Sequence, residues 1–97
     1  MNHILEIIDK TGRKILLTKK EWEHITKIHS EMANYLEDIK KTIEKPLKII
    51  FQEKGDLNRY YSYLKSRNHP EKYLRVIVKY LNNHGFIITS HFVRNLQ

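Results

Sequence analysis

Apolar side chains recur every three or four residues between Thr18 and Pro46, and this spacing constrains the fold more than any other feature of the chain. The apolar positions are Trp22, Ile25, Met32, Leu36, Ile39 and Ile43. Residues at this spacing share one face of a helix, so the segment predicts one helix or two consecutive helices with a buried stripe. Thr18 followed by Glu21 matches a capping box that starts the helix. Pro46 stops it at or before Lys45.

His29 occupies the place in this stripe between Ile25 and Met32 where an apolar residue is expected. A histidine there is either a hydrogen-bonded core residue or one that takes part in chemistry, and the pattern alone favours the core role. Ser30 would cap a second helix if the chain breaks after His29.

Short apolar runs bounded by turn signals occupy the rest of the chain. A β-hairpin is predicted over residues 3–8 and 14–17, around the turn signal Asp9–Gly12. Four further strands are predicted after the helices, over residues 47–52, 59–64, 73–80 and 86–93. The expected class is therefore α+β, with an N-terminal β-hairpin, two helices and a four-stranded antiparallel sheet. We expect a single domain over residues 1–97, divided into 1–17, 18–45 and 46–97.

The last two predicted strands decide which polar residues share a sheet face. Arg75 and Lys79 lie on one face of the predicted strand 73–80. In the following strand, 86–93, strict alternation places Ile87, Thr89 and His91 together on one face. Which face packs on the helices depends on a register that the pattern does not reveal. An exposed Arg75 face would place two cations beside Thr89 and His91 and form a platform for a phosphate. An ordinary exposed sheet face is the simpler interpretation.

Positive charge is concentrated in the second half of the chain. Residues 1–45 hold nine basic and eight acidic residues, whereas residues 46–97 hold nine basic and three acidic residues and five of the six tyrosines. Such a surface suits a polyanion, with RNA or DNA ahead of a membrane, although a basic surface also simply keeps a protein soluble. Tyr60, Tyr61 and Tyr63 would stack unpaired bases, and their alternative role is packing in the core.

The sequence lacks the residues that several classes of functional site require. The chain has no cysteine, which leaves no disulfide, thiolate metal site or cysteine nucleophile. His24 and His29 lie about 140° apart around a helix, so they do not share the face of a zinc-binding helix motif. We therefore expect no metal and no cofactor. No apolar run approaches the ~20 residues of a membrane span, and the start of the chain is not a signal peptide, so we expect a cytoplasmic protein without a membrane partner.

Several short motifs follow one another in order along the chain. They are Trp22-Glu23-His24-Ile25, His29-Ser30-Glu31-Met32, the run Ile43–Ile49, Tyr60-Tyr61, the run Leu74–Lys79 and the run Phe86–Phe92. In this order they resemble the barnase–EndoU–colicin–RelE-like (BECR) nuclease superfamily, especially its small phage- and mobile-element-associated members. The resemblance covers residues 18–94. It implies two helices before a four-stranded antiparallel sheet, and a metal-independent ribonuclease, often a toxin.

The resemblance also implies roles for individual residues. His29 and Glu31 correspond to the family's helical His-x-Glu element, and Thr89 corresponds to the hydroxyl residue of the last strand. Arg75 or Lys79 corresponds to the cation of the central strand. Relatives often have a small residue and then an aromatic one after the threonine. Here His91 departs from that pattern and adds a second histidine.

The resulting hypothesis is a toxin-like, metal-independent endoribonuclease that cleaves RNA by attack of the 2′-hydroxyl. Histidine moves the protons near neutral pH, while arginine and lysine stabilise the phosphate. The predicted catalytic residues are His29, Glu31, Arg75, Thr89 and His91, with His29 or His91 as acid or base. The predicted nucleic-acid contacts are Tyr60, Tyr61, Arg67, Lys79 and Arg94. The alternative is a non-catalytic nucleic-acid- or protein-binding module on the same fold. An inhibitory partner protein that covers the basic face is a further expectation, and the oligomeric state stays open.

Overall fold

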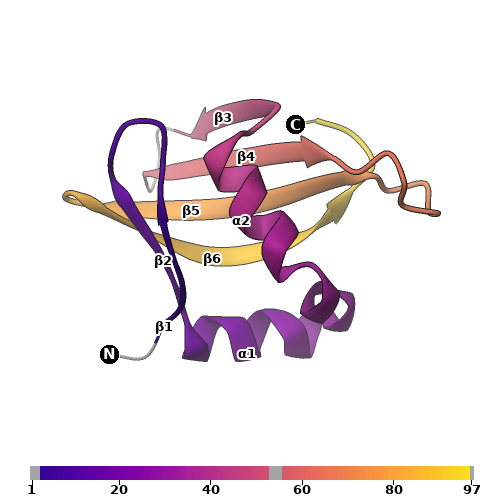
Figure 1. Cartoon of the computed structure of the whole chain (residues 1–97), viewed down its shortest axis with the longest axis horizontal. Helices are drawn as coiled ribbons and strands as arrows, with labels where there is room; N and C mark the ends of the chain where they lie inside the picture. The colour runs from indigo at the N-terminus through magenta and orange to yellow at the C-terminus, as the bar shows by residue number, and fades with distance from the viewer. Residues whose placement is uncertain (1–2, 53–55, 97) are drawn as a thin grey trace.

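The computed structural model describes residues 3–52 and 56–96, and its elements follow the predicted order of hairpin, helices and strands (Figure 1). In chain order they are β1 (His3–Ile8), β2 (Lys14–Thr18), α1 (Lys19–Ile28), the 3-10 helix η1 (Ser30–Asn34), α2 (Leu36–Glu44), β3 (Lys48–Gln52), β4 (Leu57–Tyr63), β5 (Tyr73–Leu81) and β6 (His84–Val93). The α+β class is confirmed. Within the described ranges, no helix has both the length and the apolar character needed to cross a membrane.

The strands form one mixed sheet of six strands in the order β1-β2-β6-β5-β4-β3. Neighbouring strands are antiparallel except β2 and β6, which run parallel and pair over residues 14–16 and 84–86. The four strands predicted after the helices do pair antiparallel with one another, but the sheet does not end with them, because β2 of the hairpin pairs with β6 and extends it to six strands. Ile15 and Leu17 are fully buried in the core, so the hairpin covers its apolar side chains by joining the edge of the sheet.

The helical segment is broken twice, at His29 and at Tyr35. Its start is as predicted, because the Thr18 Oγ1 accepts a hydrogen bond from the backbone N–H of Glu21 at 3.1 Å. That bond satisfies one of the free N–H groups at the beginning of α1. Most of the predicted apolar stripe is buried despite the breaks, at positions Ile25, Met32, Ile39 and Ile43. A stripe with 3.6-residue spacing therefore fills the core even where the helix is interrupted.

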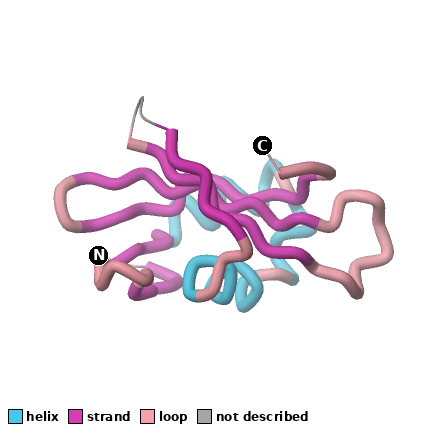
Figure 2. Tube along the Cα trace, turned by 90° about the horizontal axis from the view of Figure 1, so that it is seen from above, coloured by secondary structure: helices cyan, strands magenta, loops and turns pink. Residues whose placement is uncertain are grey.

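The helices pack against one face of the sheet. In Figure 1, α2 crosses in front of the strands and α1 runs below β6, and α2 contacts β1, β4 and β5. The face under the helices carries the buried side chains Leu74, Val76, Val78, Ile87, Ser90 and Phe92. We call the opposite face the open face. Figure 2 shows the two ends of the sheet, with the loop between β4 and β5 (residues 64–72) at one end and the turn between β5 and β6 at the other.

A β-bulge at Ile88 corrects the predicted alternation along β6. Thr89 lies opposite Ile77, but Ile87 lies opposite Val78, so one extra residue of β6 falls between these pairs. A bulge of this kind shifts the following side chains to the other face. Ile87 is therefore fully buried beneath the helices, while Thr89 and His91 are only partly buried and lie on the open face.

Candidate functional site

Two histidines from distant parts of the chain stack on each other. The rings of His29 and His91 have centroids 5.0 Å apart and an interplanar angle of 22°. His29 is the C-cap of α1, where its backbone N–H donates to the carbonyl of Ile25. His29 therefore lies just after the last residue of α1 and not within the helix, as the apolar stripe suggested. Because α1 ends beside β6, the His29 ring lies against His91. His29 is partly exposed, so it is not a core histidine.

Arg75 contacts the second of these histidines from the neighbouring strand. The two residues lie directly opposite each other on β5 and β6, and the Arg75 Nη2 is 2.6 Å from the His91 Nε2. Guanidinium groups only donate, so Nε2 accepts and a neutral His91 carries its proton on Nδ1. That Nδ1 and the Arg75 Nε are buried without a hydrogen-bond partner among the described residues. Arg75 and His91 thus each keep one side-chain nitrogen that forms no hydrogen bond among the described residues.

The surroundings of His91 favour its neutral form. Burial lowers the pKa of His91 below its ordinary value, and the positive charges of Arg75 and His29 lower it further, with Glu71 opposing the shift. A neutral imidazole can accept a proton near neutral pH. Arg75 and His91 are therefore direct neighbours, as the platform alternative for this sheet face requires.

Further cations share the open face with Arg75. Two rows of directly opposite residues cross β3, β4, β5 and β6, namely Lys48, Tyr61, Arg75 and His91, and then Ile50, Arg59, Ile77 and Thr89. Paired residues of antiparallel strands project to the same side. Lys48, Arg59 and Arg75 therefore share the open face, and Lys79 lies on it too because it is two residues beyond Ile77 on β5. The Arg59 Nε is buried and has no hydrogen-bond partner in the described part of the chain.

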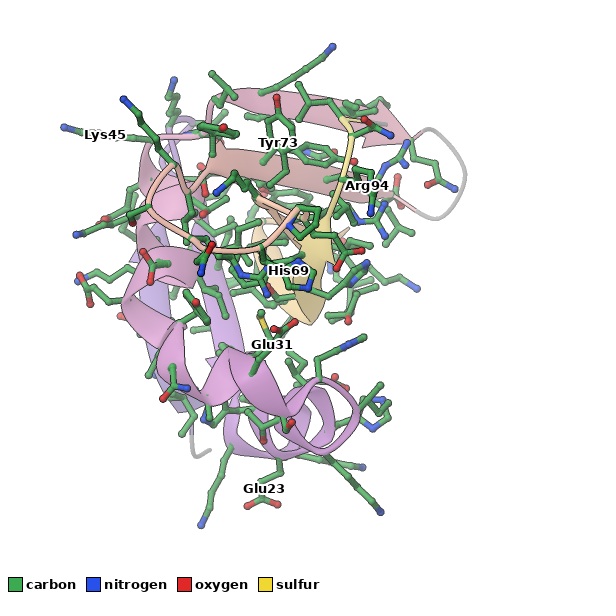
Figure 3. The ribbon with its side chains drawn as sticks, turned by 90° about the vertical axis from the view of Figure 1, so that its right-hand side faces the viewer. Glu23, Glu31, Lys45, His69, Tyr73 and Arg94 are labelled. Atoms are coloured by element: carbon green, nitrogen blue, oxygen red, sulfur yellow. The ribbon has the colours of Figure 1, made fainter. Side chains whose placement is uncertain are left out.

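The loop of residues 64–72 is held to η1 by Arg67. Its Nη2 lies 2.6 Å from the Glu31 Oε2, its guanidinium lies 3.7 Å above the Phe92 ring, and its Nη1 donates to the carbonyl of Glu71. Figure 3 views the molecule from this end, where Glu31 lies between the helical segment and the sheet. Arg67 and Glu31, predicted for phosphate binding and catalysis, are thus engaged with each other. Their contacts link the loop to the helices.

The other predicted site residues fall into two groups. Tyr60 and Tyr61 are 2% and 0% exposed, so neither ring can present a face to an incoming base, and the predicted stacking is not supported. The Tyr60 hydroxyl instead contacts that of Tyr80. Lys79 and Arg94 are exposed, Lys79 on β5 opposite Phe86 and Arg94 just after β6.

Three charged residues near this site were not among the predicted ones. Lys48 and Arg59 share the open face with Arg75, and Glu71 acts on the pKa of His91. Arg59 is next to Tyr60 on β4, and successive residues of a strand point to opposite faces, so a buried Tyr60 places Arg59 on the open face. Lys48 and Glu71 become visible only once strand pairing and the path of the loop are known.

The fold and the site together define a class: a small α+β domain that presents cations and a histidine pair on an open sheet face. The chain matches the model of the phage-Barnase-EndoU-ColicinE5/D-RelE like nuclease2 family over residues 5–97, and it belongs to that family. The predicted family resemblance is confirmed, and it supports a nuclease with a nucleic-acid substrate. No curated protein and no solved structure matches the chain.

Proposed function

We propose that the chain is a metal-independent endoribonuclease that binds the scissile phosphate on the open face, between Arg75 and the two histidines. The observation that carries the proposal is the stack of His29 on His91 with Arg75 at hydrogen-bond distance. Cleavage of RNA through its 2′-hydroxyl needs a base, an acid and positive charge at one phosphate. These three residues bring all of these groups together, and membership in a nuclease family supports the assignment.

Arg75 is proposed to exchange partners when the substrate binds. In the free protein its Nη2 donates to the neutral ring of His91. A phosphate oxygen carries negative charge and accepts a stronger, charge-assisted hydrogen bond from a guanidinium. Binding of the phosphodiester therefore draws Arg75 to the phosphate, and this releases the lone pair of the His91 Nε2 beside the reacting atoms.

The two histidines then divide the proton transfers. The His91 Nε2 takes the proton of the 2′-hydroxyl as O2′ forms its bond to phosphorus. The P–O5′ bond breaks, and protonated His29 gives its proton to O5′. The products are a 2′,3′-cyclic phosphate and a 5′-hydroxyl. This assignment uses the lowered pKa of His91, which leaves it unprotonated and able to act as the base.

The remaining residues of the open face, together with the exposed Arg94 after β6, position the RNA. Thr89, two residues before His91 on the same face, would donate its hydroxyl to a phosphate oxygen. Arg59, Lys79 and Arg94 would hold neighbouring phosphates, because phosphate contacts from cations position a nucleic acid without selecting its sequence. Tyr63, one of the three tyrosines predicted to stack bases, is 49% exposed and its ring lies 5.1 Å from that of Tyr73, so Tyr63 and Tyr73 form the proposed stacking platform.

The test is cleavage of end-labelled RNA in the presence of a chelator by wild type, His29→Ala, His91→Ala and Arg75→Gln. His29→Ala and His91→Ala are each expected to slow cleavage about 10²–10⁴-fold, the usual contribution of one acid or base. Arg75→Gln is expected to slow it about 10²–10³-fold, because it removes positive charge at the phosphate. His24→Ala is the matched control, because His24 is an exposed histidine on α1 outside this cluster. A substrate with deoxyribose at the cleaved position should resist cleavage, and the products should end in a 2′,3′-cyclic phosphate.

The same experiment separates the nuclease from the binding module. A binding module holds RNA without cleaving it, and its affinity depends on the lysines and arginines while His91→Ala leaves it unchanged. Cleavage that survives His29→Ala and His91→Ala together would contradict the proposed acid–base pair.

A further inference from the structure

A cavity lies at the other end of the sheet from the histidine pair, beside the tip of the β1–β2 hairpin. It has a volume of about 360 Å³, within the range of pockets that hold small ligands. Its lining residues are Arg13, Phe51, Asp56, Asn58, Tyr80 and Asn82. Tyr80 and Arg75 are five residues apart on β5 and belong to opposite faces. At about 3.3 Å per residue the cavity is therefore roughly 17 Å from the proposed scissile phosphate.

The charged wall of this cavity is fixed by a hydrogen-bond network around Asp9. The buried carboxylate accepts hydrogen bonds from the backbone and hydroxyl of Thr11, from the backbone of Arg13 and from the hydroxyl of Tyr80. Burial opposes ionisation of Asp9, but these hydrogen bonds outweigh it and lower the pKa of the carboxyl. The Arg13 guanidinium lies 3.7 Å above the Tyr80 ring, and its Nε donates to Thr11. Arg13 and Tyr80 are therefore held in place before any ligand arrives.

Asn58 lines this cavity and has one side-chain acceptor without a hydrogen-bond donor. The residue is 9% exposed, and its Oδ1 is buried without a hydrogen-bond partner among the described residues. Burying an amide oxygen without a donor is unfavourable, so a ligand that supplies the donor removes that cost. The Asp56 carboxylate is a second acceptor in the lining. The cavity thus favours a ligand edge that donates hydrogen bonds.

Phe51 supplies an apolar surface at the same cavity. Its side chain is 63% exposed on β3, opposite Asn58, so the two residues project from the same face of neighbouring strands. An exposed ring beside a buried hydrogen-bonding group is suited to a flat heterocycle, which stacks on the ring while its edge reaches the amide. Arg13, whose Nε lies 3.5 Å from the Asp9 Oδ2, would share its positive charge between Asp9 and an anion carried by the same ligand.

We propose that this cavity binds one nucleotide, with a base that carries an exocyclic amino group stacked on Phe51 and donating to the Asn58 Oδ1, and with its phosphate near Arg13. The nucleotide is either part of the RNA, remote from the cleaved phosphate, or a free nucleotide. The proposal rests on the proposed function only for the first of these sources. Binding at the cavity is a separate event from cleavage and can be measured without it.

The test is titration of isotope-labelled full chain with AMP, GMP, CMP and UMP, followed by the amide resonances. We expect shifts around residues 12–13, 56–58 and 80–82, and about tenfold weaker binding of UMP, whose base has no amino group. Phe51→Ala and Asn58→Ala should weaken binding at this cavity at least tenfold. Ile49→Ala is the matched control, because Ile49 is exposed on the same face of β3 but does not line the cavity.

The outcomes separate this inference from the proposed function. Shifts confined to residues around His29, Arg75 and His91, or equal effects of Phe51→Ala and Ile49→Ala, would overturn the cavity proposal while the nuclease proposal stands. Binding at the cavity without RNA cleavage would support the cavity and count against the nuclease. A short oligonucleotide that shifts the same resonances more tightly than any mononucleotide identifies RNA as the source. Equal affinities of the oligonucleotide and the mononucleotide identify the free nucleotide as the source.

Because Asn58 is buried, the thermal unfolding of Asn58→Ala is measured first. If that variant does not fold, Phe51→Ala alone tests the proposal.

Discussion

The Arg75 Nη2 lies 2.6 Å from the His91 Nε2 because the register of β5 and β6 places the two residues directly opposite each other. A cation in contact with an imidazole opposes the second positive charge that protonation would add. Burial and Arg75 are the two largest causes that lower the pKa of His91. The contact therefore links the charge state of a proposed catalytic residue to a single arginine.

Replacing Arg75 by glutamine is expected to raise the pKa of His91, because the substitution removes one of its lowering causes. The measurement is a pH titration of the His91 ring signals by NMR in wild type and Arg75→Gln. Lys79→Gln is the control, since Lys79 lies on the same strand and face but pairs with Phe86. An unchanged His91 titration in Arg75→Gln would contradict the assigned cause.

The lowered pKa of His91 also predicts how stability depends on pH. The unfolded chain takes up a proton at this histidine near its ordinary pKa of about 6.5, whereas the folded chain does so only at lower pH. Between these two values the unfolded state binds more protons, so the free energy of unfolding falls as the pH is lowered through this window. Urea unfolding from pH 7 to pH 5 should show this fall, and His91→Gln should show less of it. Equal slopes in the two proteins would contradict the assignment.

Arg67 is expected to stabilise the fold rather than bind RNA. Its side chain is 8% exposed, pairs with Glu31 and stacks on Phe92, so Arg67→Ala should lower the free energy of unfolding by about 1–3 kcal/mol. Glu31 is 48% exposed, so a double-mutant cycle with Glu31→Gln should give a coupling of only about 0.5–1 kcal/mol. Arg94→Ala, at an exposed arginine after β6, should leave the stability unchanged. A loss of RNA affinity in Arg67→Ala without any loss of stability would favour phosphate binding instead.

Gly85 is expected to tolerate no side chain where β2 pairs with β6. A Cβ at this position would lie 2.9 Å from the Val78 Cγ1 and 3.1 Å from the Ile15 Cγ1. Both neighbours are fully buried, so Gly85→Ala forces repacking and should cost about 1–3 kcal/mol. Thermal unfolding followed by circular dichroism measures the loss, with Asn83→Ala in the exposed turn as the control. Equal melting temperatures for the two variants would contradict tight packing at Gly85.

The sequence predicts those features of the fold that depend on local pattern. The cap at Thr18 follows from the capping-box pattern with Glu21, and the buried positions Ile25 and Ile39 follow from helical spacing. The parallel pairing of β2 with β6 does not follow, because it joins strands that no turn connects. The same holds for the bulge at Ile88, whose position is determined by packing across β5 and β6.

The candidate site shows the same division. His29, Arg75 and His91 were selected from the sequence as residue types in suitable places, but their contact depends on where α1 ends and on the register of β6. Tyr60 and Tyr61 were selected as aromatic residues among cations, and both are buried. Composition does not distinguish an exposed ring from a packed one, so those assignments needed tertiary structure.

Arg59 provides the sharpest test of the open face as the RNA-binding surface. It shares that face with Arg75, and its Nε has no hydrogen-bond partner among the described residues, so a phosphate is a suitable ligand. Arg59→Gln should weaken binding of a non-cleavable RNA and reduce the slope of log affinity against log salt by about 0.7, the value for one phosphate contact on a single strand. Lys41→Gln removes the same charge from the exposed surface of α2, and it should leave the slope unchanged if RNA lies on the open face. Equal changes of slope in both variants would mean that RNA responds to the net charge of the chain and not to this face.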